Sequence, residues 1–116
     1  MNKNSPEIVI CTYKVKPGKE REMEALLAKH WPTLHRAGLT TDEAPRIYRG
    51  KASEKPGGAH GAERTYVEIF SWKSADAPRV AHETPGVMAV WEPMGACCEH
   101  MDFPHFDALD LAKVGA

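Results

Sequence analysis

The order in which strand patterns and helix patterns follow one another restricts the fold of this chain more than any other feature. Residues 8–15 (IVICTYKV) are β-branched and aromatic and run into a Pro-Gly turn, which predicts a strand. From residue 19 to residue 37 apolar positions recur every three or four residues, which predicts a helix that Gly38 ends. Two further strands are predicted for residues 46–52 and 64–73.

The remainder of the chain continues with helical segments and one last strand. Ser74 is expected to cap a short helical turn, and Thr84 is expected to cap a longer helix whose first residue is Pro85. Residues 100–109 alternate as a strand does, but Pro104 has no amide to donate. This strand should therefore lie at a sheet edge or contain a bulge.

The resulting order is βαββαβ, with the glycine-rich residues 54–63 as a hairpin loop between the middle strands. It predicts an α+β protein with one domain over residues 1–116, a four-stranded antiparallel sheet and both helices on one face, the ferredoxin-like architecture. The strand at 64–73 carries bulk on both faces, with Val67 and Ile69 on one and Tyr66, Phe70 and Trp72 on the other. The sheet face without helices therefore needs cover, which a second copy of the chain would supply.

Charge and hydropathy exclude several classes of partner. The net charge is −1, from 15 basic and 16 acidic residues spread along the chain, so no basic surface for nucleic acid is expected. RNA-recognition domains share the βαββαβ order, but Glu68 stands in the strand that would stack bases. No stretch reaches the roughly 20 apolar residues of a membrane span, and the first residues lack the apolar run of a signal peptide. A cytoplasmic protein with three reduced cysteines is expected.

The stretch ACCEHMDFPHF, residues 96–106, contains metal-binding residue types. We place Cys98 on the inward stripe of the second long helix, with Val87, Val90, Trp91 and Met94. Cys97 would then point about 100° away from Cys98 on the helix. His100 and His105 have opposite parity on one strand and would face opposite sides of the sheet. The four side chains converge poorly, so no metal site and no cofactor are predicted.

Two polar residues occupy positions that should be buried. His30 lies in the apolar stripe of the first helix, and Glu68 shares a strand face with aromatic residues. Their functional interpretation is an acid–base pair beside a cavity; the alternative is a core histidine and a glutamate paired with Arg or Lys. The sequence does not decide which sheet face carries Glu68. The residues expected to contact a ligand are Trp31, Tyr48, Tyr66, Trp91 and His105.

The chain resembles the dimeric α/β barrel superfamily, which includes antibiotic-biosynthesis monooxygenase-like proteins, in an uncharacterised branch. The resemblance rests on YKVKPGKE (13–20), HWPTLHRAGL (30–39), VEIFSWKS (67–74), and TPGVMAVWEPMG with MDFPHF (84–106). It implies two sheets paired into a barrel and a small apolar or aromatic ligand between sheet and helices. Activities in the superfamily include cofactor-free oxygenation of aromatic molecules, haem breakdown and muconolactone isomerisation. In the haem-degrading members a tryptophan is followed by an iron-binding histidine late on the second helix. Here no histidine follows Trp91 within its helix, so the resemblance does not imply haem.

Two functional hypotheses follow from the residues and the resemblance together. The first is a homodimer that binds a small molecule and acts as a cofactor-independent monooxygenase on an aromatic or polyketide-like substrate, with His30 and Glu68 as catalytic residues. The second is a noncatalytic dimeric binding or structural protein. The second hypothesis predicts a filled interior and an arginine bonded to Glu68.

Overall fold

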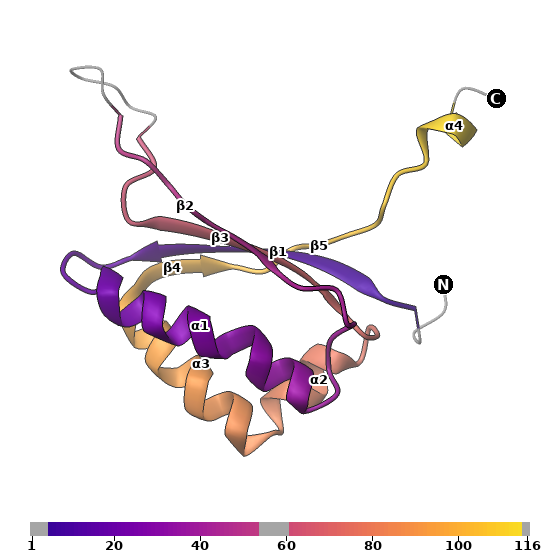
Figure 1. Ribbon diagram of the computed structural model, residues 1–116, viewed down its shortest axis with the longest axis horizontal. Coiled ribbons are helices and arrows are strands. Elements are labelled where there is room, and N and C mark those ends of the chain that lie inside the picture. The colour runs from indigo at the N-terminus through magenta and orange to yellow at the C-terminus, as the bar shows by residue number, and fades with distance from the viewer. Residues whose placement is uncertain (1–4, 54–60, 115–116) are drawn as a thin grey trace.

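The computed structural model describes residues 5–53 and 61–114, so most of the hairpin loop predicted at 54–63 lies outside the described residues. The elements follow the predicted order (Figure 1). The predicted short helical turn is helix α2, the predicted last strand is divided into β4 and β5, and α4 is an additional short helix. They are β1 (Glu7–Val15), α1 (Glu20–Arg36), β2 (Arg46–Arg49), β3 (Thr65–Trp72), α2 (Ala77–His82), α3 (Pro85–Cys97), β4 (Cys98–Asp102), β5 (His105–Phe106) and α4 (Leu111–Val114).

The strands form one antiparallel sheet in the order β2-β3-β1-β4, and β5 also pairs with β1. Helices α1, α2 and α3 lie on the same face of this sheet, and the other face is left without helices (Figure 1). The expected α+β, ferredoxin-like fold is thus confirmed. In the register of the sheet, Cys11 of β1 lies opposite Glu68 of β3, and Val9 lies opposite His105 of β5.

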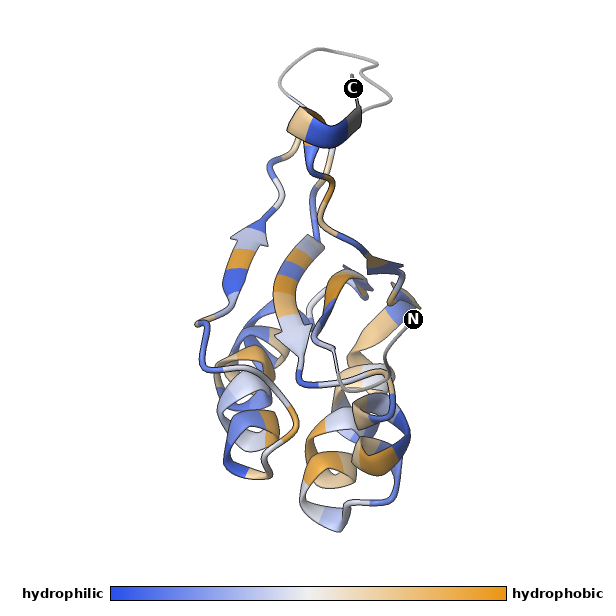
Figure 2. Ribbon diagram, turned by 90° about the vertical axis from the view of Figure 1, so that its right-hand side faces the viewer, coloured by the Kyte–Doolittle hydropathy of each residue, from blue (hydrophilic) through white to orange (hydrophobic). Residues whose placement is uncertain are grey.

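Hydrophobic and hydrophilic residues alternate along the strands, as Figure 2 shows. The helix-facing side of β1 is buried at Val9, Cys11, Tyr13 and Val15. The opposite side carries Ile8 and Ile10 on β1 and Val67 and Ile69 on β3, all only partly covered within one chain. The apolar residues of the helix-free face therefore remain available to a further packing partner.

Helix α1 buries Met23, Leu27, His30 and Leu34, which belong to the predicted stripe. It ends with Gly38 at a φ of 77°, a conformation that side chains with a Cβ rarely adopt. There the amide of Leu39 donates to the carbonyl of Leu34 over 3.0 Å, which closes the helix end.

The predicted capping residues of α2 and α3, Ser74 and Thr84, do not cap these helices. Asp76, rather than Ser74, immediately precedes α2, and no side chain caps that helix. Thr84 and Pro85 do begin α3, but the Thr84 hydroxyl donates to the carbonyl of Val80 over 2.7 Å. The hydroxyl has therefore found a partner in the preceding turn and does not cap α3.

The junction between α3 and β4 also differs from the prediction. Cys97 ends the helix and belongs to its buried face, whereas Cys98 begins β4 with extended backbone angles. The assignment of Cys98 to the helical stripe was therefore wrong, because the helix ends one residue earlier. The predicted strand at 100–109 is interrupted at Pro104, whose carbonyl accepts from the amide of Ile10 over 3.1 Å.

Within residues 5–53 and 61–114, no helix is long and apolar enough to cross a membrane.

Candidate active site

A cavity of about 330 Å³ lies between the helix-facing side of the sheet and helices α2 and α3. Most of its wall is apolar and aromatic, with Phe70 and Trp72 from β3, Met94 from α3 and Met101 from β4. The polar side chains in the wall are those of Cys11, Tyr13, His30, His82, Glu92, Trp91 and His105. A mostly apolar enclosure with a few polar groups is typical of small-molecule sites.

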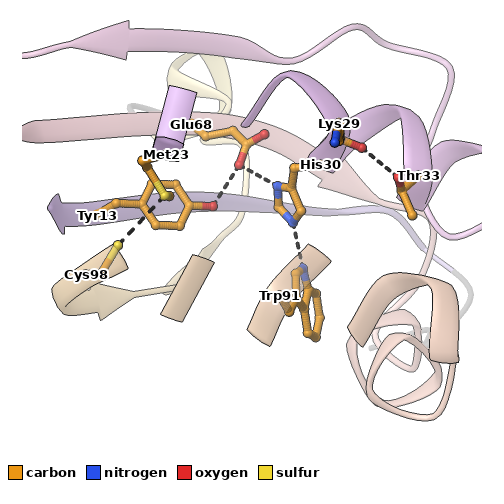
Figure 3. A network of polar contacts seen from close by, with 8 residues as sticks. All are labelled: Tyr13, Met23, Lys29, His30, Thr33, Glu68, Trp91 and Cys98. Carbon is orange, nitrogen blue, oxygen red and sulfur yellow. Dashed lines mark hydrogen bonds and ion pairs between the residues drawn. The ribbon is translucent and has the colours of Figure 1, made fainter. Parts of the chain in front are cut away.

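Four side chains from four elements form a hydrogen-bonded chain beside this cavity (Figure 3). The hydroxyl of Tyr13 donates to Oε1 of Glu68 over 2.8 Å. Nδ1 of His30 lies 2.8 Å from the same oxygen. The indole Nε1 of Trp91 donates to Nε2 of His30 over 2.7 Å. We refer to Tyr13, His30, Glu68 and Trp91 as the polar tetrad.

The hydrogen bonds define the protonation of His30. An indole N–H can only donate, so Nε2 of His30 accepts from Trp91 and carries no proton. The ring's remaining proton is then on Nδ1 and is donated to Glu68. Glu68 thus selects the tautomer whose Nε2 lone pair is directed away from the carboxylate. Since His30 lines the cavity, a proton-accepting nitrogen lies at its wall.

Glu68 is fully buried on the helix-facing side of the sheet, which settles the question that the sequence left open. Its hydrogen-bond partners are Tyr13 and His30, and not the arginine or lysine considered as an alternative. The second carboxylate oxygen, Oε2, has no hydrogen-bond partner within the described parts of the chain. Burying a carboxylate oxygen without a hydrogen bond is costly.

Burial and the charge of Glu68 also act on the two neighbouring acids of β1. Burial, followed by the nearby Glu68 charge, raises the pKa of Cys11 to about 12. The same two causes, in the same order, raise the pKa of Tyr13 far above its ordinary value. Both groups therefore keep their protons at neutral pH, and the Tyr13 hydroxyl stays a donor to Glu68.

The structure brings together some of the predicted site residues and separates others. Trp91 and His105 line the cavity with His30, and Nδ1 of His105 lies 2.6 Å from Oε1 of Glu7. Trp31 is outside this cavity and stacks on His35 with ring centroids 4.5 Å apart.

Tyr48 and Tyr66 also lie away from the cavity, along a separate groove between α1 and β2. There the Tyr66 hydroxyl donates to Oε2 of Glu24 over 2.5 Å, and Tyr48 is 53% exposed. Three of the five predicted ligand contacts are therefore not part of the cavity wall.

Sequence reasoning missed Tyr13 and Cys11. Both have the parity of Val9 and Val15, so they share one face of β1. That parity was readable in the sequence, but it did not reveal that this face meets Glu68. The connection depends on the pairing of Cys11 with Glu68 across β1 and β3.

The metal-binding residue types at 96–106 are dispersed. His100 pairs with Asp102 over 2.8 Å at the surface, and Cys97 contacts Glu22. No group of three or more His, Cys, Asp or Glu side chains arranged to hold a metal ion occurs among the described residues.

Comparisons with known proteins give a clear result for the fold. No family model and no curated protein sequence matches this chain. Among solved structures, SnoaB, a cofactor-independent oxygenase from Streptomyces nogalater, is similar with a TM-score of 0.67 and 19% identity, over 91% of this chain and 95% of that one. Rv0793 from Mycobacterium tuberculosis is similar with a TM-score of 0.64 and 22% identity, over 93% of this chain and 99% of that one.

A structure described as an antibiotic biosynthesis monooxygenase is similar with a TM-score of 0.64 and 16% identity, over 90% of this chain and 99% of that one. At these identities the likeness establishes the fold. The expected resemblance to antibiotic-biosynthesis monooxygenase-like proteins is thereby confirmed at the level of architecture.

Proposed function

We propose that the cavity binds a small aromatic or polyketide-like molecule and that the protein oxygenates it with molecular oxygen and no cofactor. The observation that carries this proposal is the unprotonated Nε2 of His30, which accepts from the Trp91 indole while Glu68 holds the ring proton on Nδ1. A volume of about 330 Å³ lies within the range of small-ligand pockets. The apolar wall suits an aromatic ring, and the histidine suits its acidic hydroxyl.

The first step is removal of the hydroxyl proton of the substrate. The hydroxyl replaces the indole N–H of Trp91 as the donor to Nε2 of His30, and its proton then passes to that nitrogen. Glu68 stabilises the resulting imidazolium through the Nδ1–H bond. The apolar surroundings strengthen this charge pairing, because little water screens it.

The oxygen step needs only the deprotonated substrate and O₂. The ring carbon para to the oxygen anion is electron-rich and forms a C–O bond with O₂, and the peroxide anion takes the proton back from His30. The hydroperoxide then breaks its O–O bond and loses the hydrogen of that carbon, so that water leaves and a carbonyl remains. The sum is one phenol and one O₂ giving one quinone and one water, with O₂ as the oxidant.

Three lines of support favour this proposal over a noncatalytic module. The module hypothesis expected a filled interior, and the chain has a cavity beside His30. It expected an arginine on Glu68, and the partners are Tyr13 and His30. In addition, SnoaB, whose fold is shared, is described as a cofactor-independent oxygenase.

We also propose that the protein acts as a homodimer through the helix-free face of its sheet. Ile8, Ile10, Val67 and Ile69 form a partly covered apolar surface there, and Phe106, opposite Ile8, extends it at 45% exposure. A second copy packing on this surface would remove it from water and leave the cavity on the helix side of each sheet.

Oxygen uptake with phenols, naphthols and hydroquinones tests the activity, with binding measured in parallel by tryptophan fluorescence. We expect one O₂ consumed per product formed, and we expect His30→Gln to lower turnover at least 100-fold while ligand still binds. His100→Gln is the matched control, because His100 also pairs with a carboxylate but lies outside the cavity. Binding without oxygen uptake would identify a carrier and refute the oxygenase; absence of binding would refute both.

A further inference from the structure

The cavity contains a second histidine that is held by a carboxylate in the same way as His30. Nδ1 of His105 lies 2.6 Å from Oε1 of Glu7, and the two side chains are 35% and 20% exposed. His105 belongs to the cavity wall. Its Nε2 has no hydrogen-bond partner within residues 5–53 and 61–114, so this nitrogen is available to a ligand.

The sheet register places this second pair away from the polar tetrad. Val9 lies opposite His105 in β5, and Cys11 lies opposite Glu68 in β3, on the other side of β1. Two residues along a strand and two strand spacings across the sheet separate the Cα atoms of Glu68 and His105 by about 12 Å. All these positions share the helix-facing side of the sheet. His105 therefore lies across β1 from Glu68, the residue that holds His30, and both histidines line the cavity.

We propose that His105, positioned by Glu7, is a specificity-determining residue that binds the far polar group of the ligand. This inference rests on the proposed function, and it narrows the ligand to aromatic molecules with a hydroxyl or carbonyl group at both ends. Neutral Nε2 accepts from a hydroxyl, and protonated Nε2 donates to a carbonyl, so both groups suit it. A ligand with a single polar group that binds His30 would leave Nε2 of His105 to water and would gain no hydrogen bond there.

Two other titratable side chains face the same space and belong to the helices above it. His82 at the end of α2 has its ring 4.8 Å from the ring of Trp91, and Glu92 of α3 lines the cavity. Both are exposed, so water pairs with them whether or not a ligand is bound. His105 is also exposed, but it differs in that Glu7 fixes its ring, and a bound aromatic ring would reduce the access of water to its Nε2.

The test compares two probes that differ in one hydroxyl. A naphthalenediol with one hydroxyl on each ring, on opposite sides, is measured against the naphthol with a single hydroxyl, by isothermal titration calorimetry. One additional hydrogen bond should make the diol bind about threefold to tenfold more tightly. His105→Leu should abolish this preference and leave the affinity for the naphthol within about twofold, because that probe needs only His30.

His100→Leu is the matched control, since it removes a histidine paired with a carboxylate on neighbouring β4 outside the cavity. It should keep the full preference for the diol. Glu7→Gln tests the positioning role, and it should weaken the diol alone, with a changed pH dependence of its affinity. If the parent protein binds both probes equally, or if the preference survives in His105→Leu, the inference is overturned while the proposed function stands. If neither probe binds, both are overturned.

Discussion

Replacing Tyr13 by phenylalanine should cost about 2 kcal/mol of folding stability. The change removes one hydroxyl, which donates to Oε1 of Glu68 over 2.8 Å, and both side chains are completely buried. A hydrogen bond to a charged group contributes about 1.5–3 kcal/mol, and an unpaired buried acceptor cannot turn to water for compensation. Among the described residues Oε2 of Glu68 is already without a partner, so His30 would become the one donor left to the carboxylate there.

The chain contains its own calibration of this change, because it has three tyrosines in graded environments. Tyr66 also donates to a carboxylate, but its acceptor Glu24 is exposed, so Tyr66→Phe should cost about 0.5 kcal/mol. Tyr48 is 53% exposed, and Tyr48→Phe should stay within about 0.5 kcal/mol of the parent. Each variant loses one hydroxyl oxygen. Tyr13 and Tyr66 differ in the burial of the carboxylate that accepts from them, and Tyr48 is an exposed reference.

Urea denaturation at one fixed protein concentration measures the series, because association would otherwise shift the midpoints. Equal slopes of unfolding free energy against urea would show that the variants unfold from comparable structures. A loss for Tyr13→Phe no larger than that for Tyr66→Phe would refute the reasoning, since burial of Glu68 would then have no energetic consequence.

Three further predictions address other parts of the molecule. The Tyr66 hydroxyl holds the pKa of Glu24 below its usual 4.5, so this bond stabilises the fold above that pH. The contribution is lost as the pH falls through the folded pKa. The difference in unfolding free energy between the parent and Tyr66→Phe, measured by urea denaturation, should therefore disappear at acidic pH. Burial raises the pKa of Cys11 to about 12 and that of Cys98 to about 11, so a thiol-reactive dye should label folded protein slowly at neutral pH and guanidinium-unfolded protein at once; equal rates would contradict the buried thiols. Ile69→Lys places a charge on the helix-free face and should convert a dimer to monomer in sedimentation velocity, whereas an unchanged dimer would move the interface elsewhere.

The fold could be predicted from the sequence because its signals are local and agree with one another. Apolar spacing defined α1, and Pro85 marked the start of α3. The inward direction of His30 followed from the same spacing. The end of α3 was predicted less well, because no glycine or proline marks it. Cys98 continues the apolar spacing of the helix, but its backbone is already extended.

The site could be predicted only in part, because it depends on pairing between distant segments. Glu68 was recognised as a buried carboxylate, but its partners Tyr13 and His30 are 55 and 38 residues away along the chain. Trp31 and Tyr48 had the right residue type and the wrong location, since an aromatic side chain packs equally well in the core or on the surface of this fold. No local pattern distinguishes these outcomes.

The buried glutamate also has a consequence for how the chain finds its correct sheet pairing. Because β3 is apolar at both parities, sliding it by one residue would exchange Val67 and Ile69 for the aromatic face at little hydrophobic cost. The same slip would carry Glu68 to the bare side of the sheet and strand Tyr13 and His30 beneath the helices. The polar contacts of Glu68 thus specify a single register for β3. The apolar side chains on its two faces would not distinguish that register from a shifted one.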